Sequence, residues 1–109
     1  MKGEKDNGCV LTSVIESEIK ILKRHIDILK AVIENEPVGI IKLSEATDYP
    51  QHTIRYSLRI LEQEGIIEPS SRGAVTTKEL EKLMKSLKKS LSNIRGDLEE
   101  ISKSIEVKM

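Results

Sequence analysis

The chain has 109 residues, of which 38% are hydrophobic and 33% are charged, and its 18 basic and 18 acidic side chains leave no net charge. This length predicts one domain with appended helices. No apolar run approaches the ~20 residues that cross a bilayer, and no signal peptide is visible. We therefore expect no membrane-spanning segment and a cytoplasmic protein.

The residue types present predict binding rather than catalysis. His25, His52, the single cysteine Cys9 and scattered carboxylates form neither a catalytic triad nor a metal-ligand spacing. We expect no enzyme activity, no cofactor and no metal, and a solvated or locally hydrogen-bonded His25. One thiol cannot form an internal disulfide, which suits a reducing compartment. Cys9 is interpreted as an incidental tail residue, with redox sensing or an intersubunit bond as the alternatives.

Residues 1–10 are polar and glycine-containing, which predicts a disordered tail. A long helix should follow from about Leu11 to Asn35. Its apolar residues alternate at spacings of four and three, as in a heptad seam: Ile15, Ile19, Leu22, Ile26, Leu29 and Ile33. The half from about Leu22 onward, widened by Ile28 and Val32, suits packing in a domain core. Ile15 and Ile19 lie beyond that half and need another partner.

A short helix and a sharp bend are predicted next. Glu36-Pro37 ends the long helix, because a residue before proline avoids the α region. Residues 38–41 (VGII) are short and apolar and predict a brief strand. A helix from about Lys42 to Thr47 should face inward through Leu43 and Ala46. Asp48 tolerates the left-handed backbone of a bend; alternatively, it caps the following helix at capping-box spacing from Gln51.

A further helix is predicted from about Pro50 to Glu64. Its buried stripe recurs at i, i+4 and i+7 in Ile54, Leu58 and Leu61. The opposite face carries five polar side chains: Gln51, His52, Arg55, Tyr56 and Arg59. Gly65 should end the helix, since glycine adopts the left-handed conformation that follows many helices.

A β-hairpin should follow this helix. The first strand begins near Ile66, residues 70–73 (SSRG) form a four-residue tip, and residues 74–76 (AVT) return. Arg72 therefore lies at the tip.

From Lys78 to about Glu106 a second long helix is predicted, with Thr76 or Thr77 as its N-cap. Its apolar residues form an unbroken a/d seam: Leu80, Met84, Leu87, Leu91, Ile94, Leu98, Ile101 and Ile105. A helix of about 30 residues is roughly 45 Å long, so a chain of this size cannot bury the whole edge in its own core. Lys88 and Arg95 flank the seam without matching acids, so charge does not favour parallel pairing.

Both long helices thus present apolar seams without an intramolecular partner. This predicts a symmetric homodimer through Ile15, Ile19 and the C-terminal seam. Leu at a with Ile at d leans towards higher oligomers, and a hairpin between the two long helices is the intramolecular alternative. We divide the chain into a tail (1–10), a domain with a helical extension (11–77) and a dimerisation helix (78–109).

The segment from about residue 22 to residue 77 resembles winged helix-turn-helix transcriptional regulators. Its apolar and turn residues fall on the positions of that family: Leu43-Ser44, Tyr49, Ile54, Leu58, Leu61 and Gly65-Ile66-Ile67. The segments IRYSLRILEQEGII and SSRGAVTT are similar to the corresponding segments of small archaeal regulators. The resemblance implies a mainly α fold with a small β-hairpin wing (α+β), extended here by long N- and C-terminal helices.

In that family the second helix of the motif enters the major groove. By position, this implies base or backbone contacts from Gln51, His52, Thr53, Arg55, Tyr56 and Arg59. Arg55 suits guanine and Gln51 suits adenine through bidentate hydrogen bonds, and Arg59 suits phosphate. Arg72 is expected on the minor groove or phosphate, and Lys42 and Ser44 on phosphate. The structural alternatives are that Gln51 only caps its helix and that the Tyr56 ring rests on the core.

The sequence therefore predicts a homodimeric transcriptional regulator that binds double-stranded DNA at a pseudo-palindromic site. Residues 38–77 hold four basic and five acidic side chains, so non-specific affinity should be weak. The same balance supports the alternative, a winged helix that recruits a protein and does not bind DNA directly. No effector site is evident.

Overall fold

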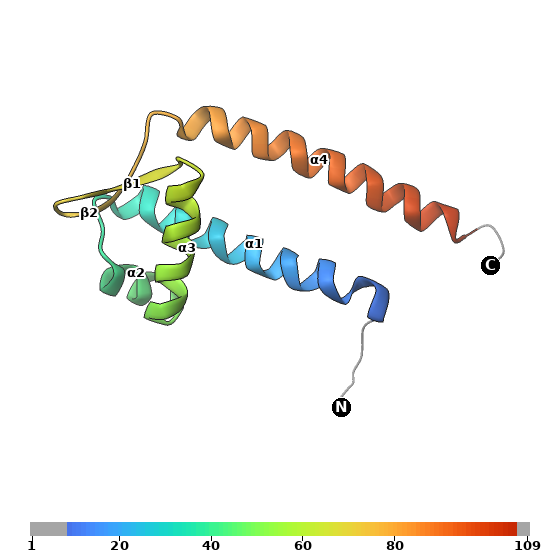
Figure 1. The fold of residues 1–109 in the computed structure, drawn as a ribbon, viewed down its shortest axis with the longest axis horizontal. Helices are drawn as coiled ribbons and strands as arrows, with labels where there is room; N and C mark the ends of the chain where they lie inside the picture. Colours follow the sequence, from blue (N-terminus) through green and yellow to red (C-terminus); the bar gives the residue numbers. More distant parts are fainter. Residues whose placement is uncertain (1–8, 107–109) are drawn as a thin grey trace. The chain divides into compact units, whose positions relative to one another are not determined.

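The computed structural model describes residues 9–106, so residues 1–8 of the predicted tail lie outside the described part. The chain divides into two units, Met1–Thr76 and Thr77–Met109. Among the described residues, the first unit contains α1 (Val10–Asn35), α2 (Ile40–Thr47), α3 (Gln51–Gln63), β1 (Ile67–Ser70) and β2 (Gly73–Thr76) (Figure 1). The second contains α4 (Leu80–Ser104). This is the predicted winged helix-turn-helix with two long terminal helices.

The core of the first unit lies between the second half of α1 and the elements that follow it. The largest fully buried apolar side chains are Ile28, Leu29, Val32, Leu43, Ile54 and Ile67. α1 contacts α2, α3 and β2. Such three-sided packing needs a broader apolar face than a coiled-coil seam. The face therefore includes Ala31 and Val32, whereas Ile33, which the heptad pattern includes, is 42% exposed.

The connection after α1 differs from the prediction. Val38 forms one isolated bridge to Ala74 of β2, with N···O distances of 3.1 and 2.8 Å. Ile40 and Ile41 are already helical, so the predicted strand over residues 38–41 is wrong beyond Val38. Gly39 is the N-cap of α2, and its carbonyl accepts the Leu43 N–H. The helical hydrogen bond therefore prevails over the β preference of the two isoleucines.

The inward face of α2 is also rotated from its predicted position. Leu43 is fully buried, and Ile40 and Thr47 are half-buried, which places the inner side at i, i+3 and i+7. Ala46 is exposed, so its predicted inward role is wrong. The helix is only eight residues long, and Leu43 alone reaches full burial.

The bend between α2 and α3 has the predicted left-handed residue. Asp48 has φ 67° and donates its backbone N–H to the Ser44 carbonyl at 2.9 Å. The alternative, that Asp48 caps α3, is wrong, because the N-cap is Pro50 and no side chain caps the helix. The Ser44 hydroxyl donates to the Tyr49 carbonyl at 2.6 Å. The bend is therefore held by residues of α2.

Helix α3 buries Ile54, Leu61 and Ser57, and Leu58 is half-buried. Gly65 has φ 79° and donates to the Glu62 carbonyl at 3.0 Å, while Ile66 donates to Leu61 at 3.1 Å. This pair of bonds is a Schellman ending, and it confirms the predicted role of Gly65.

The hairpin pairs Ile67 with Thr76 and Ser70 with Gly73. Its loop is the two residues Ser71 and Arg72, because Ser70 and Gly73 belong to the strands, so the predicted four-residue tip is wrong. The Ser70 hydroxyl donates to the Gly73 carbonyl at 2.6 Å and closes the turn.

Two further contacts attach the hairpin to the end of α1. The Glu36 carboxylate accepts the Thr76 N–H at 2.7 Å and the Thr76 hydroxyl at 3.0 Å. Gly73, with φ 125°, lies against the Val38 backbone. Thr76 therefore forms these hydrogen bonds within the first unit and does not cap α4.

Helix α4 buries no residue. Its N-cap is Glu79, and the Thr77 hydroxyl accepts the Glu79 N–H at 3.2 Å in the turn just before it. In the second half of the helix the seam is open to solvent, with Ile94 48% and Ile101 58% exposed.

Candidate nucleic-acid interface

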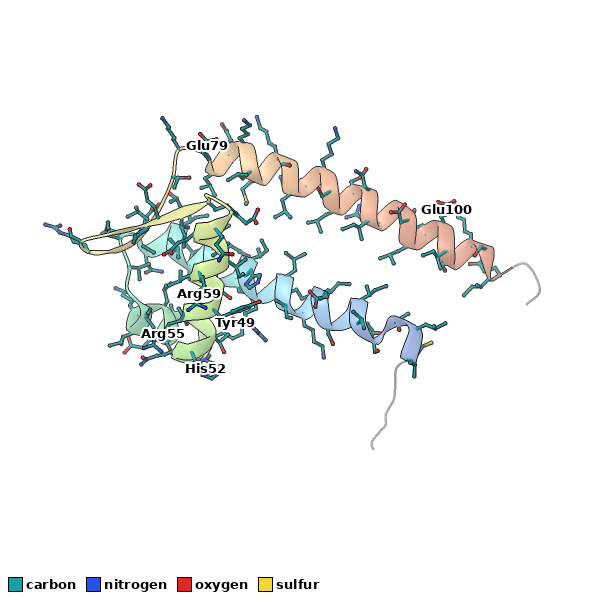
Figure 2. The ribbon with its side chains drawn as sticks, in the orientation of Figure 1. Tyr49, His52, Arg55, Arg59, Glu79 and Glu100 are labelled. Atoms are coloured by element: carbon teal, nitrogen blue, oxygen red, sulfur yellow. The ribbon has the colours of Figure 1, made fainter. Side chains whose placement is uncertain are left out.

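The outer face of α3 is polar and open. Gln51, His52, Arg55, Tyr56 and Arg59 are all exposed, and Thr53 is half-buried. Arg55 and Arg59 lie one helical turn apart, about 6 Å along the axis. Figure 2 shows His52 near the start of α3, with both arginine side chains farther along the same helix. The structure thus brings the predicted α3 residues onto one accessible surface.

The two arginine side chains have no partner among the residues that the structure describes. Among residues 9–106, the structure gives neither guanidinium a hydrogen bond or an ion pair. Both line a shallow hollow of about 250 Å³ beside α3, with Ile40 and Leu58 as its apolar part and Glu62 as its acid. An unpaired guanidinium keeps its planar set of donors available for bidentate bonding to a base edge or a phosphate.

Behind this face, His25 of α1 meets two consecutive residues of α3. His25 Nδ1 and Ser57 Oγ are 2.8 Å apart, and Ser57 is fully buried. The centroids of the His25 and Tyr56 rings are 5.7 Å apart at a tilt of 41°. Burial, and then the nearby Arg24 charge, lower the pKa of His25. The predicted solvated or locally bonded histidine is therefore corrected to a tertiary contact between α1 and α3.

The bend carries a second link to α1. The Tyr49 hydroxyl donates to Asp27 Oδ2 at 2.9 Å, and this hydrogen bond, followed by burial, raises the pKa of Tyr49. Together with His25 and Ser57, it ties the start and middle of α3 to α1. The sequence pattern predicted neither link, although a polar residue within the apolar side of α3 is a signal for the burial of Ser57.

The remaining predicted residues lie outside α3. Lys42 is exposed on α2, whereas the Ser44 proton is committed to the Tyr49 carbonyl and is not available to a phosphate. Arg72 is exposed in the hairpin loop, where its backbone N–H is held by the Ser70 hydroxyl at 3.2 Å.

The described residues include neither a group suited to hold a metal ion nor a helix suited to cross a membrane. Within residues 9–106, no three His, Cys, Asp or Glu side chains are grouped so that they could hold a metal ion. No helix in this range has the length and apolar character to cross a membrane.

Part of the chain is similar to a known family of regulators. Residues 23–68 match the family described as bacterial regulatory protein, arsR family. These residues lie within the winged helix-turn-helix and are similar to that family over this range. The chain matches no curated protein.

This similarity supports a DNA-binding transcriptional regulator. The matched range includes all of α2 and α3, and hence the exposed arginine face. It ends within β1, before Arg72, and leaves out α4 and the first half of α1. The similarity to archaeal regulators stays a prediction from two sequence segments, IRYSLRILEQEGII and SSRGAVTT.

Proposed function

We propose that the protein is a homodimeric, sequence-specific regulator of transcription that binds a pseudo-palindromic duplex. The observation that carries this proposal is the pair of exposed guanidiniums on the outer face of α3, which have no partner within residues 9–106. In a winged helix-turn-helix this face enters the major groove. A two-fold protein then reads two half-sites about one helical turn (~34 Å) apart, or a multiple of it.

Specific roles follow from position and side-chain chemistry. Arg55 reads guanine through O6 and N7, and Gln51 reads adenine, because each matches the base with two hydrogen bonds. Arg59, one turn farther from the start of α3, bonds phosphate, and His52, Thr53 and Tyr56 contact bases or the backbone.

Residues outside α3 supply the flanking contacts. Arg72 of the hairpin loop reaches the minor groove or a phosphate, and Lys42 of α2 bonds phosphate. Ser44 is the weakest member of the predicted set, since its proton is used within the bend.

The apolar surface supports the homodimer. In the first half of α1, Val10 and Leu11 are each 87% exposed, and Ile15 and Ile19 are 45% and 39% exposed. The seam of α4 is likewise open, from Leu91 at 37% to Ile105 at 70%. Apolar surface of this extent marks an interaction site. A second copy of the chain supplies the same two surfaces and covers both by symmetry.

The near-neutral charge of residues 38–77 favours one competing function, in which the winged helix binds a protein through Arg55 and its neighbours. Salt dependence separates the two functions. A DNA-binding protein loses affinity for duplexes steeply as salt rises, because phosphate contacts release counterions. A protein-binding module would show no duplex binding at low salt.

Selection of bound duplexes from a random pool tests the proposal directly. We expect a two-fold symmetric consensus, which also reports the half-site spacing. Arg55→Ala should then cost about 1–3 kcal/mol at the selected site and relax the preference at one base pair. Arg55→Lys keeps the charge but loses the bidentate fork, so it should restore non-specific binding without the preference. The control is Lys30→Ala, which removes an exposed positive charge from α1. Unchanged binding by Arg55→Ala would refute the groove assignment.

A further inference from the structure

His25 of α1 contacts two consecutive residues of α3, one buried and one exposed. Its Nδ1 lies 2.8 Å from the hydroxyl of Ser57, which is fully buried. Its ring centroid lies 5.7 Å from that of Tyr56, whose side chain is 46% exposed. His25 itself is half-buried, so it lies between the core side of α3 and the polar outer face. A change at His25 can therefore reach the outer face through Tyr56.

Only the ring of Tyr56 is held by the residues that the structure describes. Its hydroxyl has no hydrogen-bond partner within residues 9–106. A tyrosine on a helix has two common χ1 rotamers, which direct the hydroxyl to different places. Contact with His25 requires the ring to lie toward α1, so this contact favours one rotamer before any ligand binds. Fixing a side chain in advance reduces the entropy that binding would otherwise cost.

These contacts give His25 a role in DNA binding. We propose that His25 is a positioning residue, which holds the Tyr56 ring so that the Tyr56 hydroxyl donates a hydrogen bond to a DNA phosphate. The proposal rests on the DNA-binding function put forward above. It narrows the contact of Tyr56 from bases or backbone to the backbone, and it adds a residue of α1 to those that determine how α3 meets the duplex.

The chemistry of Tyr56 favours phosphate over a base edge. A phenol has one O–H donor, whereas the side chains that discriminate bases best, such as those of Arg and Gln, form two hydrogen bonds. Tyr56 lies next to Arg55, about 100° from it around α3 and toward α1. Tyrosine is among the side chains that bond phosphate, and such contacts set the register of a protein on the duplex. Through Tyr56, His25 thus helps to place Arg55 against its base.

A double-mutant cycle in the full chain tests the positioning role. All variants carry Ser57→Ala, so that loss of His25 leaves no buried hydroxyl unpaired. In this background, Tyr56→Phe should weaken binding to the selected duplex about tenfold, and His25→Ala about fivefold. The variant with both substitutions should bind about as tightly as Tyr56→Phe alone, because His25 acts through the Tyr56 hydroxyl. Additive losses, or unchanged affinity after either single substitution, would overturn the inference.

His25→Phe is the conservative control for the ring contact. In the same Ser57→Ala background it keeps a ring beside Tyr56, so it should retain the affinity that His25→Ala loses. Circular dichroism at the temperature of the binding assay checks that each variant is folded. If His25→Ala does not fold, His25→Leu, which fills the space without a ring, replaces it in the cycle. Equal affinities for the ring-bearing and ringless variants would show that the ring contact has no role and would refute the positioning.

Salt dependence identifies the group that Tyr56 contacts and separates the two proposals. A tyrosine brings no charge to the interface, so Tyr56→Phe should weaken binding to all duplexes alike and leave the slope of log K against log salt unchanged. Arg59→Ala should reduce that slope by about one. A loss confined to one base pair would assign Tyr56 to a base and overturn the inference, while DNA binding stands. Absence of duplex binding by the unaltered chain at low salt would refute the proposed function itself.

Discussion

The second half of α1 and the whole of α4 carry nearly the same apolar spacing but have different surroundings. In α1, Ile28, Leu29 and Val32 are at most 1% exposed, because α2, α3 and β2 pack against them. In α4 no residue is buried. An apolar period of four and three therefore indicates that a helix has a partner. It does not indicate whether that partner belongs to the same chain.

The same contrast exists within α1. Residues 10–20 are all exposed, and burial begins at Ile21, although the helix continues without a break to Asn35. About one turn after this change, His25 of α1 hydrogen-bonds Ser57 of α3. One continuous helix thus joins the proposed dimer surface to the winged domain.

Truncation of one leucine in the core that packs against α1 and of one leucine in α4 should give the largest difference. Leu43→Ala removes a fully buried side chain and should lower the free energy of unfolding of the winged domain by about 2–5 kcal/mol, the cost of lost burial plus a cavity. Leu98→Ala, at a side chain 42% exposed, should change that quantity by no more than about 0.5 kcal/mol and instead weaken dimerisation. Urea titrations at several protein concentrations separate the effects. Equal losses for the two variants at a concentration where the protein is monomeric would break the comparison.

Two glycines provide a second pair. A Cβ on Gly73 would lie 2.5 Å from the carbonyl carbon and oxygen of Val38, and φ is 125°, so Gly73→Ala should cost about 1–3 kcal/mol and loosen the hairpin. Gly96 has no heavy atom within 4 Å of such a Cβ, and Gly96→Ala should stabilise α4 by about 1 kcal/mol through helix propensity. Thermal unfolding followed by circular dichroism measures both. A stabilising Gly73→Ala would contradict the docking of the hairpin on Val38.

The smallest effect should appear in the pH dependence of the free energy of unfolding of the winged domain. Burial lowers the pKa of His25, so between the unfolded value near 6.5 and the lower folded value the unfolded chain binds more protons. Stability should therefore decrease as the pH falls below about 6.5 and level off below the folded pKa. His25→Gln should flatten this dependence in urea titrations from pH 4 to 8. His52→Gln, which removes the other histidine, is the control; a profile unaffected by His25→Gln would exclude the buried contact as its cause.

Most elements could be predicted because their signals are local. Gly65 ends α3 and Asp48 takes the left-handed bend, since few residues tolerate that backbone. The polar face of α3 follows from a helical period of 3.6, and the structure leaves it exposed. The missed details depend on distant neighbours. Ser57 is buried because His25, 32 residues earlier, bonds its hydroxyl, and no spacing within α3 encodes that partner.

The sequence by itself determined the helices, their order and the faces that would be apolar, because backbone preference and periodicity act over a few residues. Only the tertiary structure decided which apolar face became core. It turned α2 so that Ala46 faces solvent, reduced the predicted strand to one bridge from Val38 to Ala74, and left α4 without a buried side chain. The physical reason is that burial is a property of contacts between segments, and those contacts form only once the segments meet.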